Sequence, residues 1–172
     1  MIDNVLYIFI AGIVQGLTEF LPISSSGHLI IVKEFFNIGT KSIDLEIMLH
    51  LGTVFSIIFY YKKYLAKIIK NIINNKEDDK FFIYLLIMGC LPVAIFGLIF
   101  KNNIETEFAN ISYLPFTFML TSLFLYSTKR SKPTNSITFK IIIIVSIIQI
   151  ITLFPGISRS GITIATLLIL GV

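Results

Sequence analysis

The longest uncharged stretch of the chain, residues 81–100, restricts the fold more than any other feature. It reads FFIYLLIMGCLPVAIFGLIF, twenty residues without a charged side chain. A helix of that length spans the hydrocarbon core of a bilayer, which is about 30 Å thick. Three further apolar stretches, 47–61, 111–127 and 141–154, extend the pattern. Together they predict an all-α, polytopic membrane helix bundle.

The composition excludes an ordinary soluble protein. Hydrophobic residues make up 55% of the chain and charged residues only 14%, and the mean hydropathy is +0.88. A soluble domain carries about 25% charged residues. The 172 residues fit a single integral membrane domain, 1–172. Residues 1–4 lack the basic start of a signal peptide, so we expect them to stay on the mature protein.

Basic residues are unevenly distributed among the connections between apolar stretches. Residues 62–80 hold six lysines and 129–140 hold four basic residues, whereas 33–46 and 101–110 hold two and one. The positive-inside rule places the first two connections in the cytoplasm and the last two outside. The net charge of +4 follows from this sorting. We therefore expect no nucleic-acid partner.

A polar cluster occurs twice inside apolar sequence. Residues 20–28 read FLPISSSGH and residues 153–161 read LFPGISRSG; Gln15 lies seven residues before the first proline, and Gln149 six before the second. Proline followed by serines and glycine breaks a helix, and irregular backbone persists at membrane depth where protein or water covers it. We predict a re-entrant hairpin over 5–32 and a site assembled from two broken helices in an inverted-repeat-like arrangement.

The charge assignment brings both clusters to the same side of the membrane. The stretch 141–154 runs outward and delivers the second cluster to the outer half of the bilayer. The first cluster precedes the connection 33–46, which is also assigned outside. We therefore expect the two clusters to meet on the external side.

Glu19 is the acidic residue of the first cluster. It lies four residues after Gln15, so the two side chains share one face of a helix. An ionisable group at the centre of a membrane helix costs about 2.5–3.5 kcal/mol, and it normally faces a polar partner or a cavity. We favour a catalytic or metal-ligating carboxylate over the alternative, an interfacial glutamate at the end of a span.

The serine turn of the first cluster comprises Ser24, Ser25, Ser26, Gly27 and His28. Serines at the start of a helix cap it, and the free backbone N–H groups there attract anions. Capping alone is the alternative interpretation. The imidazole of His28 favours catalysis, because it supplies a general base for a serine or a nucleophile of its own.

The second cluster repeats this pattern in Ser158, Arg159, Ser160 and Gly161 and adds a guanidinium group. Of the 14 basic residues, two are arginines, and one of these lies inside apolar sequence. Arginine offers planar, bidentate hydrogen bonds that suit phosphate oxygens. A structural salt bridge to Glu19 is the alternative. Ser160 is followed one helical turn later by Thr163, whose hydroxyl could add a further contact.

These groups together predict a phosphate site on the outer side of a membrane. Walker-type loops with a lysine and paired cysteine or histidine ligands are absent from the sequence, so neither nucleotide hydrolysis nor a zinc site is indicated. A site reached through apolar walls suits a lipid-linked phosphate ester. His50, at the start of the stretch 47–61, is interpreted as a packing residue, with a supporting role beside the site as the alternative.

The two clusters resemble a known family. Residues 15–28 (QGLTEFLPISSSGH) are similar to the first signature of the bacterial undecaprenyl-diphosphatases, and residues 155–163 (PGISRSGIT) to the second. The similarity covers essentially the whole chain. It implies a multi-pass phosphatase of the bacterial cytoplasmic (inner) membrane that hydrolyses undecaprenyl diphosphate to undecaprenyl phosphate and inorganic phosphate. That activity recycles the lipid carrier of peptidoglycan synthesis, supports cell-wall biogenesis and cell shape, and confers bacitracin resistance.

The resemblance also implies roles for individual residues. It assigns Glu19 to an acidic motif, Ser25 and His28 to a catalytic turn, and Arg159 to a phosphate-binding turn. We favour Ser25 as nucleophile with His28 as base; attack by His28 is the alternative. A divalent cation, Mg²⁺ or Ca²⁺, is implied, with Glu19 and Gln15 as its ligands, although glutamate is common where Gln15 stands. The phosphate-binding residues implied are Ser24, Ser26, Gly27, Ser158, Arg159, Ser160 and Thr163.

The family's chain continues beyond the second signature, whereas this chain ends at Val172. We therefore expect the N-terminal portion of a longer architecture. One alternative is an inactive truncated remnant, and another is a polyprenyl-phosphate translocase, because transporters share broken helices. The expected partners are a polyprenyl diphosphate and membrane lipids. The choice between monomer and homodimer is left open.

Overall fold

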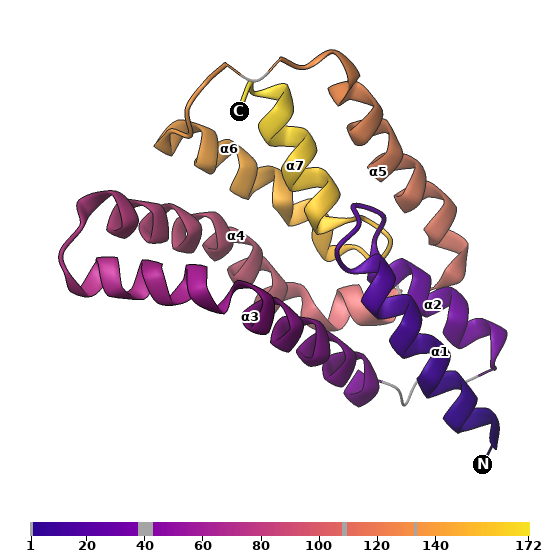
Figure 1. The fold of residues 1–172 in the computed structure, drawn as a ribbon. Helices are drawn as coiled ribbons and strands as arrows, with labels where there is room; N and C mark the ends of the chain where they lie inside the picture. Colours follow the sequence, from indigo (N-terminus) through magenta and orange to yellow (C-terminus); the bar gives the residue numbers. More distant parts are fainter. Residues whose placement is uncertain (1, 38–42, 108–109, 133) are drawn as a thin grey trace.

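A computed structural model describes residues 2–37, 43–107, 110–132 and 134–172. Within these ranges the regular elements are all helices and there is no strand, which confirms the all-α prediction. The elements, drawn in Figure 1, are α1 (Ile2–Thr18), α2 (Ser25–Phe35), α3 (Ile43–Ile73), α4 (Glu77–Glu107), the 3₁₀-helix η1 (Ile111–Tyr113), α5 (Leu114–Ser127), the 3₁₀-helix η2 (Thr128–Arg130), α6 (Phe139–Ile148), the 3₁₀-helix η3 (Gln149–Leu153) and α7 (Arg159–Ile169).

Each apolar stretch predicted as a membrane helix falls almost entirely on helical residues: 47–61 in α3, 81–100 in α4, 111–127 in η1 and α5, and 141–153 in α6 and η3. Among the described residues, Glu77–Phe100 is the one helical segment long and apolar enough to cross a membrane by length and composition. The apolar segments of α1, of α6 with η3, and of α7 are shorter. Their insertion as spans stays a prediction.

Helices α3 and α4 form a long hairpin (Figure 1), in which α4 also packs against α6 and η3. The chain reverses at Asn75, whose φ of 59° is a conformation that asparagine tolerates. Large apolar side chains stay exposed along both helices, for example Phe59 at 74% and Leu98 at 80%. A surface of this kind suits lipid rather than water and supports membrane association.

The basic connection 62–80 is almost entirely helical rather than a loop. Helix α3 continues to Ile73 and α4 begins at Glu77, so the lysines of this connection lie on the two helices beside the turn. Lysine is a good helix former, and the backbone hydrogen bonds of a helix continue where side chains become polar. The side-chain amide of Asn71 donates to Asp79 Oδ2 at 2.8 Å and ties the two helices together.

The helix break predicted within 5–32 occurs at the proline and the serines, as expected. Helix α1 ends at Thr18, α2 begins at Ser25, and Pro22 lies in the turn between them. The two helices pack side by side around a buried core of Tyr7, Ala11 and Leu29. The predicted helical hairpin is therefore confirmed, while its depth in a bilayer stays a prediction.

The turn between α1 and α2 lies beside the turn between η3 and α7 (Figure 1). A Cβ added to Gly27 would lie 2.9 Å from the Cα of Gly156, and one added to Gly161 would lie 3.0 Å from the carbonyl oxygen of Pro22. Real Cβ atoms essentially never approach within 3.0 Å. Glycine at these positions thus allows the two turns to touch, as the sequence predicted.

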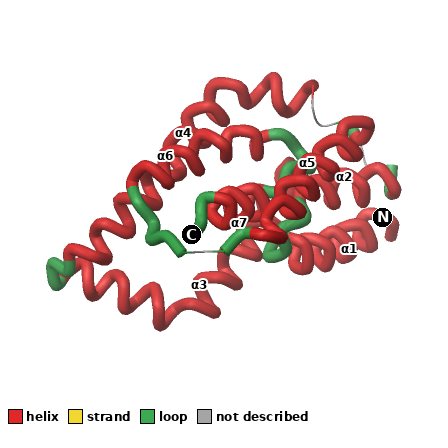
Figure 2. Tube along the Cα trace, turned by 90° about the horizontal axis from the view of Figure 1, so that it is seen from above, coloured by secondary structure: helices red, strands yellow, loops and turns green. Residues whose placement is uncertain are grey.

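The C-terminal residues bind the connection that follows α5. The backbone N–H groups of Thr134 and Asn135 donate to the carbonyl oxygen of Gly171 at 2.7 and 2.6 Å. Figure 2, turned by 90°, shows the end of the chain beside this loop. Helix α7 packs against both α5 and α6, and it is thereby fixed at its two ends.

Replacing Gly27 by alanine should lower the thermal unfolding midpoint of the protein in detergent. The new Cβ would meet the Phe118 ring at 2.6 Å as well as the Gly156 backbone, and overpacking of this kind costs about 1–3 kcal/mol. Gly16→Ala is the matched control, because no heavy atom lies within 4 Å of its added Cβ. The control should unfold at the same or a higher temperature, since alanine favours a helix. Equal midpoints for the two variants would contradict the close approach.

Candidate phosphate site

The first serine turn caps α2. Ser24 is the N-cap residue, and its Oγ accepts a hydrogen bond from the backbone N–H of Gly27 at 3.4 Å. The Oγ atoms of Ser24 and Ser26 lie 3.3 Å apart. Ser24 itself has a φ of 68°, which an L-residue adopts only under constraint. The capping interpretation is therefore correct for Ser24, and Ser25 is free for another contact.

The second serine turn repeats this arrangement at α7. Ser158 is the N-cap residue, and its Oγ accepts from the backbone N–H of Gly161 at 3.1 Å. The Oγ atoms of Ser158 and Ser160 lie 3.2 Å apart. Ser160 Oγ also donates to the carbonyl oxygen of Leu21 at 3.5 Å, which links the second cluster to the first. Two helix N-termini with the same cap thus lie near each other, and each favours an anion.

The hydroxyl of Thr121 on α5 holds the second turn in place. It accepts from the backbone N–H of Ser158 at 3.1 Å and lies 3.4 Å from the carbonyl oxygen of Gly156, to which it donates. Thr121 is 3% exposed. Thr121 is not among the predicted site residues, because a threonine in an apolar helix carries no local signal of a partner 37 residues away.

Side chains from three helices contact one carboxylate oxygen of Glu19. The Nε2 of Gln15 on α1 donates to Glu19 Oε2 at 3.0 Å, and the hydroxyl of Ser25 on α2 donates to the same atom. The Nε2 of His50 on α3 lies 3.7 Å from it. Glu19 follows the last residue of α1, and its backbone N–H still donates to the carbonyl oxygen of Gln15. The acidic residue is therefore fixed beside the serine turn rather than at a free interface.

The imidazole of His28 is oriented by its own helix start. Its Nδ1 lies 2.7 Å from the carbonyl oxygen of Ser24, and the ring packs against Phe118 with centroids 5.2 Å apart. Because a carbonyl oxygen only accepts, Nδ1 carries a proton and Nε2 is the nitrogen left for chemistry. Within the described residues no hydrogen bond joins His28 to Ser25, whose hydroxyl faces Glu19 instead.

Arg159 is the first residue of α7, and its side chain is exposed. Among the described residues the ion pairs include none between Arg159 and Glu19, so the structural salt bridge considered as an alternative does not form. The Thr163 hydroxyl donates to the carbonyl oxygen of Arg159 at 2.8 Å and accepts from Gln149 Nε2 at 2.7 Å. Thr163 and Gln149 therefore support the backbone of the arginine turn.

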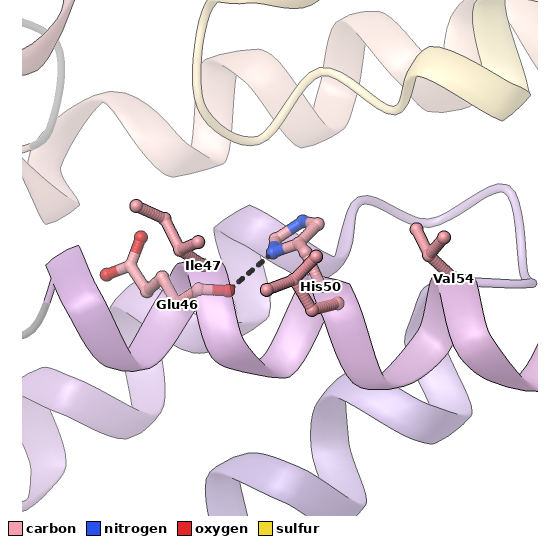
Figure 3. Close-up of a pocket in the computed structure, with 5 residues that line it drawn as sticks. Glu46, Ile47, His50 and Val54 are labelled. Carbon is pink, nitrogen blue, oxygen red and sulfur yellow. Dashed lines mark hydrogen bonds between the residues drawn. The ribbon is translucent and has the colours of Figure 1, made fainter.

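A hollow of about 340 Å³ lies along α3. It is lined by Glu46, Ile47, His50, Leu51 and Val54, four of which are labelled in Figure 3. None of the predicted phosphate-binding residues belongs to this lining. Of this lining, His50 contacts Glu19 of the predicted site.

Two nitrogens and one hydroxyl contact the carboxylate of Glu19 among the described residues. The described residues contain no group of three or more His, Cys, Asp or Glu side chains that could hold a metal ion. However, Oε1 of Gln15 is buried without a hydrogen-bond partner, and Gln15 is 1% exposed. As placed, Nε2 of Gln15 faces Glu19, and with the amide turned by half a rotation Oε1 and the carboxylate would suit a hard divalent cation such as Mg²⁺ or Ca²⁺.

Comparisons with known proteins cover almost the whole chain. The profile of a family described as "Bacitracin resistance protein BacA" matches residues 8–172. The chain is 38% identical over 165 residues to an undecaprenyl-diphosphatase of Thermosipho melanesiensis, covering 94% of this chain and 66% of the relative. It is 38% identical over 169 residues to undecaprenyl-diphosphatase 4 of Bacillus thuringiensis (strain Al Hakam), covering 96% and 63%. The chain thus spans slightly under two thirds of the length of these relatives.

Thr121→Val should destabilise the protein. Valine keeps the shape of threonine but leaves the buried N–H of Ser158 without its acceptor, a loss of about 1–3 kcal/mol. Thr121→Ser retains the hydroxyl and is the matched control. Thermal unfolding in detergent should separate the two variants, with Thr121→Val unfolding at the lower temperature. Equal unfolding of both would show that the hydroxyl does not hold the second turn.

Proposed function

Because the chain belongs to the bacitracin resistance protein BacA family, we propose that it hydrolyses undecaprenyl diphosphate to undecaprenyl phosphate and inorganic phosphate. The names of its relatives describe this reaction. The exposed apolar helices support a substrate that is itself a membrane lipid. Release of undecaprenyl phosphate would recycle the carrier of cell-wall precursors and lessen sensitivity to bacitracin.

The observation that carries the proposal is the hydrogen bond from Ser25 to Glu19 beside two capped helix starts. A diphosphate needs an anion site, a nucleophile and a proton acceptor within reach of one phosphorus atom. The N-termini of α2 and α7 supply oriented N–H groups, and Arg159 begins α7 with a planar cation. We assign the terminal phosphate group of the substrate to this pair of helix starts.

In the proposed reaction the Ser25 hydroxyl attacks the terminal phosphorus atom. Its proton passes to Glu19, the group to which it already donates a hydrogen bond. An O–P bond to serine forms, the bridging P–O bond breaks, and undecaprenyl phosphate leaves. Water then cleaves the phosphoserine, which releases inorganic phosphate and returns the serine hydroxyl. This scheme replaces His28 by Glu19 as the base for Ser25.

His28 keeps a separate role in the proposal. Its Nδ1 is occupied by the carbonyl oxygen of Ser24, so Nε2 is available to a reacting group. We assign Nε2 to the water that cleaves the phosphoserine, as a general base. The aromatic contact with Phe118 holds the ring in that orientation.

A divalent cation would be held by the carboxylate of Glu19 and, once the amide turned its oxygen toward that carboxylate, by Oε1 of Gln15. The unpartnered buried oxygen of Gln15 supports this assignment. When bound, a Mg²⁺ or Ca²⁺ ion would offset the negative charge of the diphosphate. Glutamine supplies an oxygen without charge, so the cation would depend on Glu19 for its electrostatic attraction.

We also propose a multi-pass arrangement in the cytoplasmic membrane, with the site open to the external face. The lysines beside the turn between α3 and α4 support a cytoplasmic position for that turn. The proposed partners are the polyprenyl diphosphate and the surrounding lipids. Residues 1–172 would then form one integral membrane domain, acting as a monomer or a homodimer.

Arg159→Ala should lower the rate of phosphate release from a long-chain prenyl diphosphate. Loss of one preorganised partner for phosphate oxygens costs about 10²–10³-fold in rate. Ser25→Ala and His28→Ala should also be inactive or nearly so. Arg130→Ala is the matched control, because Arg130 is the other arginine and lies exposed in η2, away from both clusters. Movement of labelled lipid across vesicles without phosphate release would contradict the proposal and favour a translocase.

Gln15→Glu should couple stability to the divalent cation. In a chelator the variant should unfold at a lower temperature than the wild type, because two carboxylates then share a buried position. Added Ca²⁺ should raise its unfolding temperature more than that of the wild type, since a ligand stabilises the state that binds it. Gln149→Glu is the control, because Gln149 contacts Thr163 rather than an acid. Equal Ca²⁺ effects in both variants would exclude a cation at Gln15 and Glu19.

A further inference from the structure

His50 has a defined place that neither packing nor the proposed reaction uses. Its Nε2 lies 3.7 Å from Oε2 of Glu19, within ion-pair distance. His50 lies 31 residues after Glu19 and belongs to a different helix from Gln15, so no local sequence pattern indicates the contact between His50 and Glu19. The same Glu19 oxygen receives the hydrogen bond from Ser25.

The orientation of the His50 ring is set by the backbone of α3. Nδ1 lies 2.8 Å from the carbonyl oxygen of Glu46, one helical turn earlier, as Figure 3 shows. That carbonyl oxygen only accepts, so Nδ1 donates to it and Nε2 faces Glu19, where Nε2 attracts the carboxylate when the ring carries a proton on both nitrogens. The hydroxyl of Thr53 in turn donates to the carbonyl oxygen of His50 at 2.8 Å. The ring is thus held by a regular helix rather than by a loop.

Packing does not explain this arrangement. The side chain of His50 is 44% exposed and borders the hollow along α3. A histidine that serves packing is normally buried, with its nitrogens satisfied inside the core. Here one nitrogen binds the backbone and the other faces a carboxylate of the proposed site. The interpretation of His50 as a packing residue is therefore not supported by its surroundings.

We propose that His50 is a positioning residue that holds the carboxylate of Glu19 for its reaction with Ser25. Gln15 from α1 and His50 from α3 approach the same Oε2 atom, so the carboxylate is restrained from two sides. Without such contacts a glutamate side chain is free to change rotamer, and its carboxylate would then no longer be aligned with the serine hydroxyl. The inference rests on the proposed diphosphatase activity and adds a residue that acts only through Glu19.

The test compares three variants in steady-state assays of phosphate release from a long-chain prenyl diphosphate in detergent. His50→Leu removes both ring nitrogens and keeps apolar bulk, whereas His50→Gln keeps a nitrogen donor. Val54→Ala is the matched control, because Val54 lines the same hollow one helical turn further on. Loss of an outer partner of a reactive group typically costs about 10–100-fold. We expect that loss in kcat for His50→Leu, with KM unchanged.

His50→Gln should recover most of the rate, and Val54→Ala should match the wild type. In a Glu19→Gln background His50→Leu should cause little further loss, because the residue acts through the carboxylate. The inference would be overturned if His50→Leu lowered kcat equally in both backgrounds, or raised KM at unchanged kcat. It would also be overturned if His50→Leu lowered the unfolding temperature and His50→Gln did not recover the rate. An inactive wild type would instead overturn the proposed function, whereas an active wild type with fully active His50→Leu would overturn the inference alone.

Discussion

The contact between the two glycine-containing turns is the constraint on which the rest of the arrangement depends. Gly27 lies against the backbone of Gly156, and Gly161 lies against the carbonyl oxygen of Pro22. Helices in a membrane gain little from apolar contact with each other, so close backbone approach through small residues is a main source of their association. Here the same approach brings two helix N-termini together and makes one site of two separate sequence clusters.

The two helix starts of the site share the same cap hydrogen bond, whereas their side-chain chemistry differs. Ser24 and Ser158 cap their helices in the same way, but the position after the cap holds Ser25 in one turn and Arg159 in the other. Anion attraction at a helix start belongs to the backbone and can be repeated. The proposed nucleophile and the proposed phosphate-binding cation are different side chains, and the two halves would supply one each.

The helices and their breaks could be predicted from the sequence, because hydropathy, proline and serine act locally. The first hairpin and the caps at Ser24 and Ser158 follow from residues within a few positions. The contacts of Glu19 with His50 and of Thr121 with Ser158 join different helices over 31 and 37 positions. Such contacts depend on rotamers and packing angles that no local pattern specifies.

The lengths of α3 and α4 have a consequence for the depth of the protein in the bilayer. Each helix has 31 residues, which corresponds to about 46 Å, against a hydrocarbon core of about 30 Å. Helices of this length must tilt or extend into the headgroup region. The lysines near the turn between α3 and α4 would then lie among anionic headgroups, where their charges would not have to enter the hydrocarbon core. In the proposed multi-pass arrangement the hairpin would act as an anchor that sets the height of the serine turns relative to the membrane surface.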